Sequence, residues 1–296
     1  MATLRELKGR IGSVASSEKI TGAMKMISSA KMHKAEGALK RLVPFRNQIE
    51  TIMGNLLSAD ADFTSPLVEP HLEVKRVSLV VLGSDEGLCG AYNTNIFKQL
   101  VVRIDELRER YGLGLAVDIY PVGKKMLKAV TKIERKGVDI VKDIAVTSKS
   151  EGRSVRDFMA ALSDAYVTGA TDRVEVIYVH YHSAGRQRLT NITFLPVDSA
   201  DLGAGSDGKG ASRPYLFEPD PQTIFSTVLP LFLLSTMQEI FAENRASEQA
   251  ARVMAMQSAN DNAKKLLEQL QLEYNKLRQQ SITSELLDIV GGQVRD

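Results

Sequence analysis

The sequence predicts a mainly parallel α/β domain flanked by two very long helices that pair as an antiparallel coiled coil. Both chain ends show apolar residues at helical spacing, and the segment between them alternates β-branched runs with helical patterns. Residues 1–58 carry ten basic and four acidic side chains, whereas residues 219–296 carry seven basic and ten acidic ones. The ends are therefore complementary in charge. We expect an N-terminal coiled-coil helix over 1–58, a central α/β domain over 59–218 and a C-terminal coiled-coil helix over 219–296.

The N-terminal segment reads as one helix from Thr3 to about Leu57, with no proline before Pro44. At about 1.5 Å per residue it would extend roughly 80 Å, far more than a small domain needs. Its middle, from Lys19 to Ala35, holds small, basic and methionine residues where an ordinary core helix has Leu or Ile. We expect this stretch to present an unusual outer surface.

The C-terminal segment has no proline between Pro230 and Asp296, and its apolar residues follow a 3-4 alternation that defines a heptad seam. This period predicts a left-handed supercoil. The simplest partner is the N-terminal helix, and the alternative is two unrelated helices packed on a globular body. The seam residues are Val253, Met256, Asn260, Ala263, Leu267, Leu270, Tyr274 and Leu277.

The central segment predicts the order βαβαβαβ, which indicates a parallel sheet covered by helices. A last strand follows through the turn at 183–186, so a closing hairpin is expected. The glycine-rich stretch Asp198–Ser212 has too little apolar content to pack. The expected strands are 74–82, 115–121, 138–141, 174–182 and 189–197, and the expected helices are 94–111, 124–136 and 154–168.

The loop GSDEGLCG at 83–90 follows a buried strand and resembles a phosphate loop at first sight. A Walker loop needs Lys and then Ser or Thr after its last glycine, but Ala91 and Tyr92 stand there. The spacing G-x-x-x-G-x-x-G also differs from the dinucleotide pattern, and Asp85 and Glu86 would repel a phosphate. We interpret the loop as a tight strand-to-helix turn.

No other pattern points to catalysis, a metal or a cofactor. Cys89 is the single cysteine, which suits a reducing compartment and a buried hydrophobic position. His180 and His182 alternate along a strand without a third ligand nearby, a pattern more typical of packing than of a metal site. The longest apolar run, 225–237, is interrupted by Ser, Thr and Pro and is too short to span a bilayer. The first residues lack the pattern of a signal peptide.

Three stretches together resemble the γ subunit of F-type ATP synthases. They are LRELKGRIGSVASSEKITGAMKMISSAKM near the start, GSDEGLCGAYNTN in the middle, and the stretch from ENRASEQAARVMAMQSAN to TSELLDIVGG near the end. The resemblance covers essentially the whole chain. It implies a coiled-coil shaft inside the ring of α and β subunits and a central Rossmann-like α/β foot that binds no nucleotide and stands on the membrane rotor ring. One departure is Glu86, where the family usually has Arg.

The resemblance also implies roles for individual positions. Lys8, Lys19, Lys25, Lys31 and Lys34 would face acidic loops of the β subunits, with a solvated helix face as the alternative. Three residues of the central domain match positions that meet the rotor ring or the ε subunit: Tyr215, Phe217 and Glu218. The positions that match the coupling contacts between shaft and catalytic ring are Met24, Lys25, Arg252, Arg278, Gln279, Thr283 and Glu285.

The implied function is that of a central rotor shaft, which transmits rotation of the proton-driven membrane ring to the catalytic subunits for ATP synthesis or hydrolysis. The expected partners are the α, β, δ and ε subunits and the c-ring, without nucleic acid or direct membrane insertion. We expect no catalytic site, cofactor or metal on this chain and a place on the cytoplasmic face of a bacterial inner membrane. The alternatives are a nucleotide-binding α/β enzyme that uses the 83–90 loop and a cytosolic coiled-coil scaffold.

Overall fold

The computed structural model describes residues 3–57, 64–198, 202 and 217–293. The chain forms two compact units, residues 1–29 with 252–296 and residues 30–251. The first unit consists of parts of two long helices, α1 (Leu4–Leu57) and α6 (Pro221–Gln293), whose remaining residues belong to the second unit. The three-part division expected from the sequence stays a prediction.

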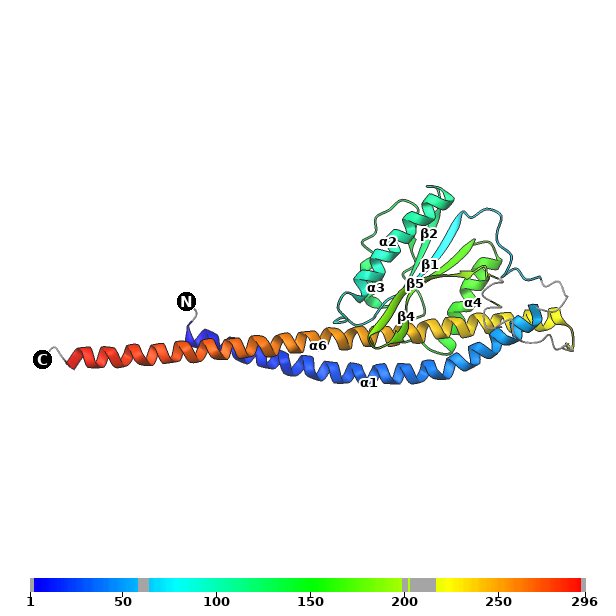
Figure 1. Ribbon diagram of the computed structural model, residues 1–296. Coiled ribbons are helices and arrows are strands. Elements are labelled where there is room, and N and C mark those ends of the chain that lie inside the picture. Colours follow the sequence, from blue (N-terminus) through cyan, green and yellow to red (C-terminus); the bar gives the residue numbers. More distant parts are fainter. Residues whose placement is uncertain (1–2, 58–63, 199–201, 203–216, 294–296) are drawn as a thin grey trace. The chain divides into compact units, whose positions relative to one another are not determined.

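The second unit contains a five-stranded sheet with the order β3-β2-β1-β4-β5 (Figure 1). β1, β2, β3 and β4 run parallel, and β5 pairs antiparallel with β4 as the predicted hairpin. The predicted mainly parallel α/β fold is confirmed. The strands are β1 (Arg76–Leu82), β2 (Ala116–Val122), β3 (Val138–Ile140), β4 (Arg173–Ser183) and β5 (Arg186–Leu195).

Helices cover both faces of this sheet (Figure 1). Along β1, Val77, Leu79 and Val81 join one core cluster with residues of α2 (Tyr92–Tyr111) and α3 (Lys124–Val130). Val80 and Leu82 point to the opposite face and join a second cluster with α4 (Arg153–Val167), α6 and the end of α1. Alternate residues of a strand thus bury themselves in two different layers, as expected for a sheet covered on both sides.

The helix predicted over 124–136 was too long, because α3 ends at Val130. The hydroxyl of Thr131 donates to the carbonyl of Lys128 (3.1 Å), and the amide of Ile133 donates to the carbonyl of Val130 (2.8 Å). Both contacts replace the next helical turn with a tight turn. The chain then reaches Gly137, whose φ of 74° lies in the left-handed region that glycine tolerates.

Both long helices begin with a side-chain cap. In α1, the amide of Thr3 donates to Glu6 and the amide of Glu6 donates to the Thr3 hydroxyl, which together form a capping box. In α6, Asp220 accepts the amide of Thr223 (2.9 Å), and Pro221 occupies the first turn, where a proline is tolerated. α6 therefore begins earlier than the proline-free stretch after Pro230 suggests.

α6 is also the one helix of the described residues that is long and apolar enough to cross a membrane by length and composition. Half of its apolar window is buried in the protein. Phe225, Leu229, Leu233 and Met237 lie in the core cluster beneath the sheet. We therefore interpret this part of α6 as a core helix of the α/β unit.

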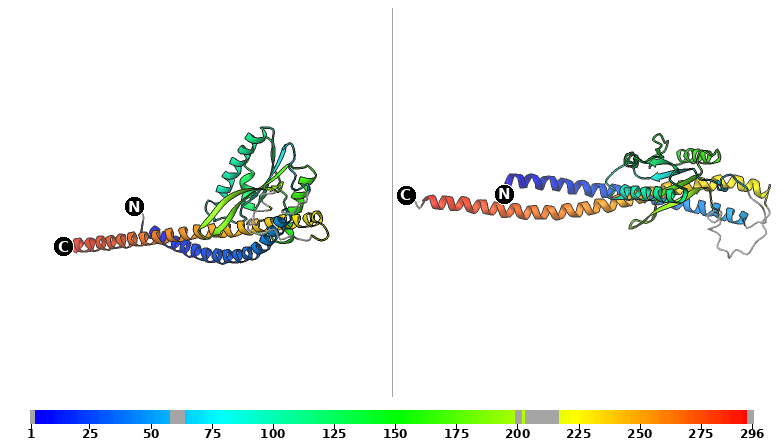
Figure 2. Two further views of the ribbon diagram at one scale, coloured as in Figure 1. Left: turned by 45° about the vertical axis from the view of Figure 1, so that its right-hand side comes forward. Right: turned by 90° about the horizontal axis from the view of Figure 1, so that it is seen from above.

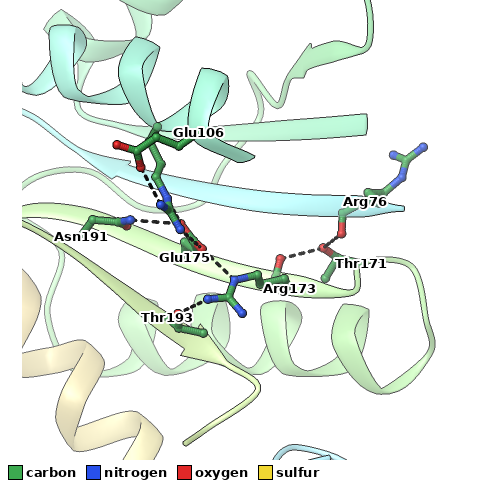
Figure 3. A network of polar contacts seen from close by, with 8 residues as sticks. Arg76, Glu106, Thr171, Arg173, Glu175, Asn191 and Thr193 are labelled. Atoms are coloured by element: carbon green, nitrogen blue, oxygen red, sulfur yellow. Dashed lines mark hydrogen bonds and ion pairs between the residues drawn. The ribbon is translucent and has the colours of Figure 1, made fainter. Parts of the chain in front are cut away.

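A buried carboxylate joins three elements on one face of the sheet (Figure 3). Glu175 of β4 is fully buried and accepts two hydrogen bonds from Arg103 of α2, at 2.7 and 2.8 Å. Arg173 donates to it at 2.7 Å and Asn191 of β5 at 3.1 Å. Burial raises the pKa of the Glu175 carboxyl, but the two arginines and Asn191 hold it below its usual range. The network binds α2 to the hairpin.

Asp172 fixes the start of β1 in the same unit. Its carboxylate accepts the backbone amides of Lys75 and Arg76, each at 2.8 Å, and lies 2.9 Å from Nδ1 of His71. Burial raises the pKa of this carboxyl, but the hydrogen bonds from His71 and the two amides hold it below its usual range. The contact therefore stabilises the fold in the ionised form.

Replacing Asp172 with Asn should cost about 1–3 kcal/mol at neutral pH, because two backbone amides and His71 would lose a charged acceptor. Since the folded pKa is lowered, this stability is present above the unfolded value of about 3.9 and is lost as pH falls through the folded pKa. Urea unfolding at pH 7 and at about pH 2.5 measures it. The difference in free energy of unfolding between wild type and variant should be smaller at the lower pH. An equal difference at both pH values would contradict the stabilising role of the ionised Asp172 carboxylate.

Candidate functional site

In the first unit, α1 and α6 pair in opposite directions, as the predicted coiled coil requires (Figure 2). Asn260 of α6 donates from Nδ2 to the carbonyl of Glu18 at 2.7 Å and lies 3.4 Å from the hydroxyl of Thr21. A Cβ on Gly22 would lie only 3.3 Å from the same Nδ2. Further along, Gly9 and Val14 line a surface hollow together with Leu270. Residues earlier in α1 therefore lie beside residues later in α6, which shows that the two helices run antiparallel.

The predicted heptad seam is the buried side of this pair. Met256, Asn260 and Leu270 are buried, and the other five seam residues are partly buried, while most residues between them are exposed. The polar Asn260 at the interface fixes the register of the two helices, because its amide has partners only in this alignment. Small residues at positions such as Gly22 allow the backbones to approach closely.

The outer surface of the pair carries large apolar residues in solvent. Met26 is 73% exposed, Ile20 60%, Ile27 55% and Met254 59%. Exposed apolar side chains gathered on one element indicate a surface that meets other protein. Part of the unusual composition of residues 19–35 thus lies on the outside of the pair, whereas Ser28, Met32 and Ala35 of the same stretch are buried.

The predicted coupling residues of this region lie at different depths. Met24 and Lys25 are partly buried in α1, within one turn of the Gly22 contact. Arg252 is only 3% exposed. Neighbouring residues of this protein therefore cover its side chain. A direct contact of Arg252 with another subunit stays a prediction.

The other four predicted coupling residues lie near the end of α6 and are exposed. Thr283 donates its hydroxyl to the carbonyl of Gln279 (2.9 Å), and Glu285 lies 3.5 Å from the hydroxyl of Ser281. Within the described residues the guanidinium of Arg278 has no hydrogen-bond or ion-pair partner. Arg278 and the side-chain amide of Gln279 are thus open to an outside acceptor.

The residues predicted to meet the rotor ring or the ε subunit precede α6 along the chain. Tyr215 lies outside the described residues. Phe217 is partly buried against the core cluster that contains Phe225, and Glu218 is exposed. The structure therefore places Phe217 as an anchor of the chain on the α/β unit and leaves Glu218 accessible.

The loop 83–90 places an acidic cap at the start of α3, the helix that follows β2. Asp85 accepts the backbone amide of Lys124 at 3.0 Å, at the first turn of α3, and the hydroxyl of Ser148 at 2.8 Å. A carboxylate at a helix N-terminus occupies the place and the charge of a bound anion. This loop is a structural junction between β1 and α3.

Two glycines let the loop approach its neighbours closely. At Gly83 a Cβ would lie 2.7 Å from the Cβ of Met126, and at Gly123 it would lie 2.8 Å from the backbone carbon and oxygen of Ser84. The φ of Gly123 is also 105°, a conformation that other residues rarely adopt. Asn244 of α6 donates to the carbonyl of Gly83 (3.1 Å), which ties the loop to the long helix.

Glu86, the departure from the family pattern, pairs with two lysines. Its carboxylate lies 2.6 Å from Nζ of Lys149 and 3.9 Å from Nζ of Lys31 on α1. The hydrogen bond to Glu86 raises the pKa of the Lys149 amine, against an opposing effect of burial. The carboxylate thus neutralises part of the basic face of α1. Sequence reasoning did not predict the contact with Lys149, because residue 149 lies in a loop far from Glu86 along the chain.

His180 and His182 lie with ring centroids 5.4 Å apart on β4, as expected from their alternation. His180 places Nδ1 2.7 Å from the buried carboxylate of Glu243 on α6. Burial raises the pKa of Glu243. Among the described residues, no group of three or more His, Cys, Asp or Glu side chains could hold a metal ion.

The model of the ATP synthase family matches residues 3–294 of this chain. The chain is 41% identical to the ATP synthase gamma chain of Phocaeicola vulgatus, over 99% of both proteins. The chain belongs to the ATP synthase gamma family. The gamma chain of Bacteroides thetaiotaomicron is 39% identical over the full length of both, and that of Leptospira biflexa is 33% identical over 99% of this chain and 98% of the relative.

Solved structures agree with the gamma-family fold. A chain in the mitochondrial ATP synthase of Euglena gracilis, in an assembly described as OSCP/F1/c-ring, has a TM-score of 0.63 at 23% identity. The match covers 98% of this chain and 93% of that one. A chain in the central stalk and c-ring assembly of Tetrahymena thermophila has a TM-score of 0.52 at 22% identity, over 81% of this chain and 99% of that one.

Proposed function

We propose that this gamma-family chain is the central rotor shaft of an F-type ATP synthase. The observation that carries the proposal is the antiparallel pair of α1 and α6, which buries a heptad seam and leaves Met26, Ile20 and Ile27 in solvent. Such a rod suits a protein collar made of the α and β subunits. The α/β unit would stand on the c-ring and contact the ε and δ subunits, through Glu218 among other residues.

The shaft acts by presenting different faces to three otherwise equal catalytic subunits. Each β subunit then meets different side chains and is biased toward a different conformation. Shifting a two-state subunit from 1:99 to 99:1 takes about 5.5 kcal/mol of differential interaction. An exposed ion pair supplies only about 0–1 kcal/mol. Coupling is therefore spread over many contacts, and single Lys→Ala changes at Lys8, Lys19 or Lys34 should be mild.

The outer surface of the pair suits sliding contact. A rotating rod cannot insert large anchors into pockets of the collar, because each insertion would have to be undone within a turn. Methionine adapts its shape to changing neighbours. The exposed Lys8 and Lys19 and the partly buried Lys25 offer charge to acidic loops of the β subunits. Near the end of α6, Arg278 and Gln279 offer directional donors to the same ring.

Bond making and breaking belong to other chains in this proposal, and this subunit needs no cofactor or metal of its own. Proton transport belongs to the membrane ring that turns the shaft. The complex lies on the cytoplasmic face of a bacterial inner membrane, so this chain is a peripheral membrane component that does not enter the bilayer. The apolar part of α6 is used in the core of the α/β unit, which supports this placement.

Purification of the tagged chain from its own cells, followed by mass spectrometry, tests the assembly. Recovery of α, β, δ, ε and c subunits with ATPase activity is the expected result. Recovery without ATPase subunits would favour a cytosolic scaffold. Equilibrium dialysis of the isolated chain with ATP tests the enzyme alternative, and saturable binding of ATP would favour it.

A positive charge at Met24 should uncouple the complex more than the loss of any single lysine. Met24 is partly buried close to the helix contact, so Met24→Lys would add a strong, fixed contact to the acidic loops and resist sliding. We expect ATP-driven proton pumping per ATP hydrolysed to fall about 3-fold to 10-fold, that is, by roughly 1 kcal/mol. Quenching of a pH-sensitive dye in membrane vesicles measures it.

Met24→Leu is the matched control, because it keeps size and apolarity, and its pumping ratio should stay near that of the wild type. Unchanged pumping in Met24→Lys, in vesicles with equal amounts of assembled complex, would count against a sliding contact at this position.

A further inference from the structure

We infer that the α/β unit contains a binding site for hydrogen phosphate in a basic cavity between α1, α6 and the loop before α4. The cavity has a volume of about 360 Å³, on the order of a dozen water molecules at roughly 30 Å³ each. Its lining includes five cations, Lys31, Lys34, Arg41, Lys149 and Arg245. All lie in the unit formed by residues 30–251.

The cations of the cavity are only partly neutralised. Lys31 and Lys149 share the carboxylate of Glu86, and Arg245 pairs with Glu151. Within the described residues, Lys34 and Arg41 have neither a hydrogen-bond nor an ion-pair partner. Two unpaired cations, about two turns apart on α1, therefore line the same hollow as Arg245. Their mutual repulsion is relieved by an anion between them.

The partly buried cation Arg245 needs a further acceptor. Its Nη2 donates to the carbonyl of Ser150 at 3.0 Å, but its Nε is buried without a hydrogen-bond partner. Burial lowers the pKa of Arg245, and the charge of Glu248 opposes this effect. A phosphate oxygen would satisfy Nε and restore the charge balance, since guanidinium groups match phosphate geometry.

A neighbouring part of the same hollow brings a helix N-terminus to the site. Arg41, Glu151 and Arg245 also line a second cavity of about 230 Å³, together with Gly152 and Val155. α4 begins there and has no side-chain cap. Its first amides are therefore available to an anion that bridges the two cavities.

Gln249 indicates which oxyanion fits. This side chain is 6% exposed, lines the basic cavity, and has a buried Oε1 without a hydrogen-bond partner. Oε1 accepts hydrogen bonds only, as do the nearby carboxylates of Glu151 and Glu248. A ligand between these groups and the cations must therefore accept on one side and donate on the other. Hydrogen phosphate does both, whereas sulfate has no hydrogen to donate.

Isothermal titration of the isolated full-length chain at about pH 8 tests the inference, with inorganic phosphate, sulfate and AMP as probes. At this pH hydrogen phosphate keeps one hydrogen and carries about the same charge as sulfate, whereas the phosphate group of AMP, with a second pKa of about 6, has lost its last proton. We expect saturable binding of one phosphate per chain, about 10-fold tighter than sulfate. AMP, which has no phosphate hydrogen to donate at this pH, should bind no more tightly than sulfate, and AMP binding as tight as that of phosphate would contradict the donated hydrogen bond.

Arg41→Gln should weaken phosphate binding about 10-fold, whereas Arg5→Gln, the same change on an exposed turn of α1 outside the cavity, should leave it unchanged. Gln249→Leu should reduce the preference for phosphate over sulfate. Because Gln249 is buried and its replacement could disturb the fold, Lys34→Gln provides a second variant at the surface. Circular dichroism checks that each variant is folded. Titrations that do not saturate, equal binding of phosphate and sulfate, or equal effects of Arg41→Gln and Arg5→Gln would overturn the inference.

This inference does not rest on the rotor function, because binding is measured on the isolated chain. If phosphate does not bind, the pull-down and pumping results still stand. If the pull-down or the pumping test fails, the result of the phosphate titration still stands.

Discussion

Glu175→Gln should lower the free energy of unfolding of the α/β unit by about 3–5 kcal/mol, the typical cost of removing one partner of a buried ion pair. The carboxylate is fully buried, while Arg103 and Arg173 keep only 19% and 18% of their side chains exposed. An amide in place of the carboxylate would leave two guanidinium groups short of a counter-charge. Urea unfolding of the chain, monitored by circular dichroism, measures the loss.

Glu106→Gln is the matched control for this change. Glu106 pairs with the same Arg103 at 2.6 Å, but its side chain is 48% exposed. Surface pairs of this kind contribute about 0–1 kcal/mol. If both variants lose the same amount of stability, the network of Figure 3 does not hold α2 to the hairpin as proposed.

Gly123→Ala should cost about 3 kcal/mol or more in the same assay. Two effects act together at this position. A φ of 105° strains any residue with a Cβ by roughly 1–3 kcal/mol. The added carbon would also lie 2.8 Å from the Ser84 backbone, which cannot move without breaking the junction between the 83–90 loop and α3.

Gly185→Ala controls for a glycine in a turn. Nothing lies within 4 Å of a Cβ built there, and its φ does not lie in the left-handed region. We expect a change within about 0.5 kcal/mol, as for an ordinary surface substitution. A Gly123→Ala protein as stable as the Gly185→Ala protein would show that the loop shifts freely and is not a fixed junction.

The long-range periodicity of the sequence predicted the fold well. Heptad spacing from Val253 to Leu277 identified the buried side of α6, because a helix pair repeats one local pattern along its length. The strands β1 and β4 were recognisable as continuous β-branched runs. The end of α3 was not predicted, because it depends on a hydroxyl of Thr131 that competes with the helix, and propensity does not register such contacts.

The functional surfaces were predicted only in part. A pattern along one helix, such as the small and basic residues of 19–35, is visible in sequence. Contacts between segments far apart in the chain are not visible in sequence. Two examples are the ion pair of Glu86 with Lys149 and the cavity lined by Arg41 and Gln249. The burial of Arg252 could not be foreseen either, since a charged residue is expected at the surface.

α6 continues past the point where α1 begins (Figure 2). Beyond Leu277, Ile282, Leu286 and Leu287 are 48%, 57% and 66% exposed. The part of α6 beyond Leu277 has no partner helix among the described residues of this chain, and a short single helix is only marginally stable in water. Its last turns should therefore exchange amide hydrogens fastest in the free chain. The tip of the axle would then acquire its rigidity from a bearing made of other proteins, and assembly would finish the folding of this subunit.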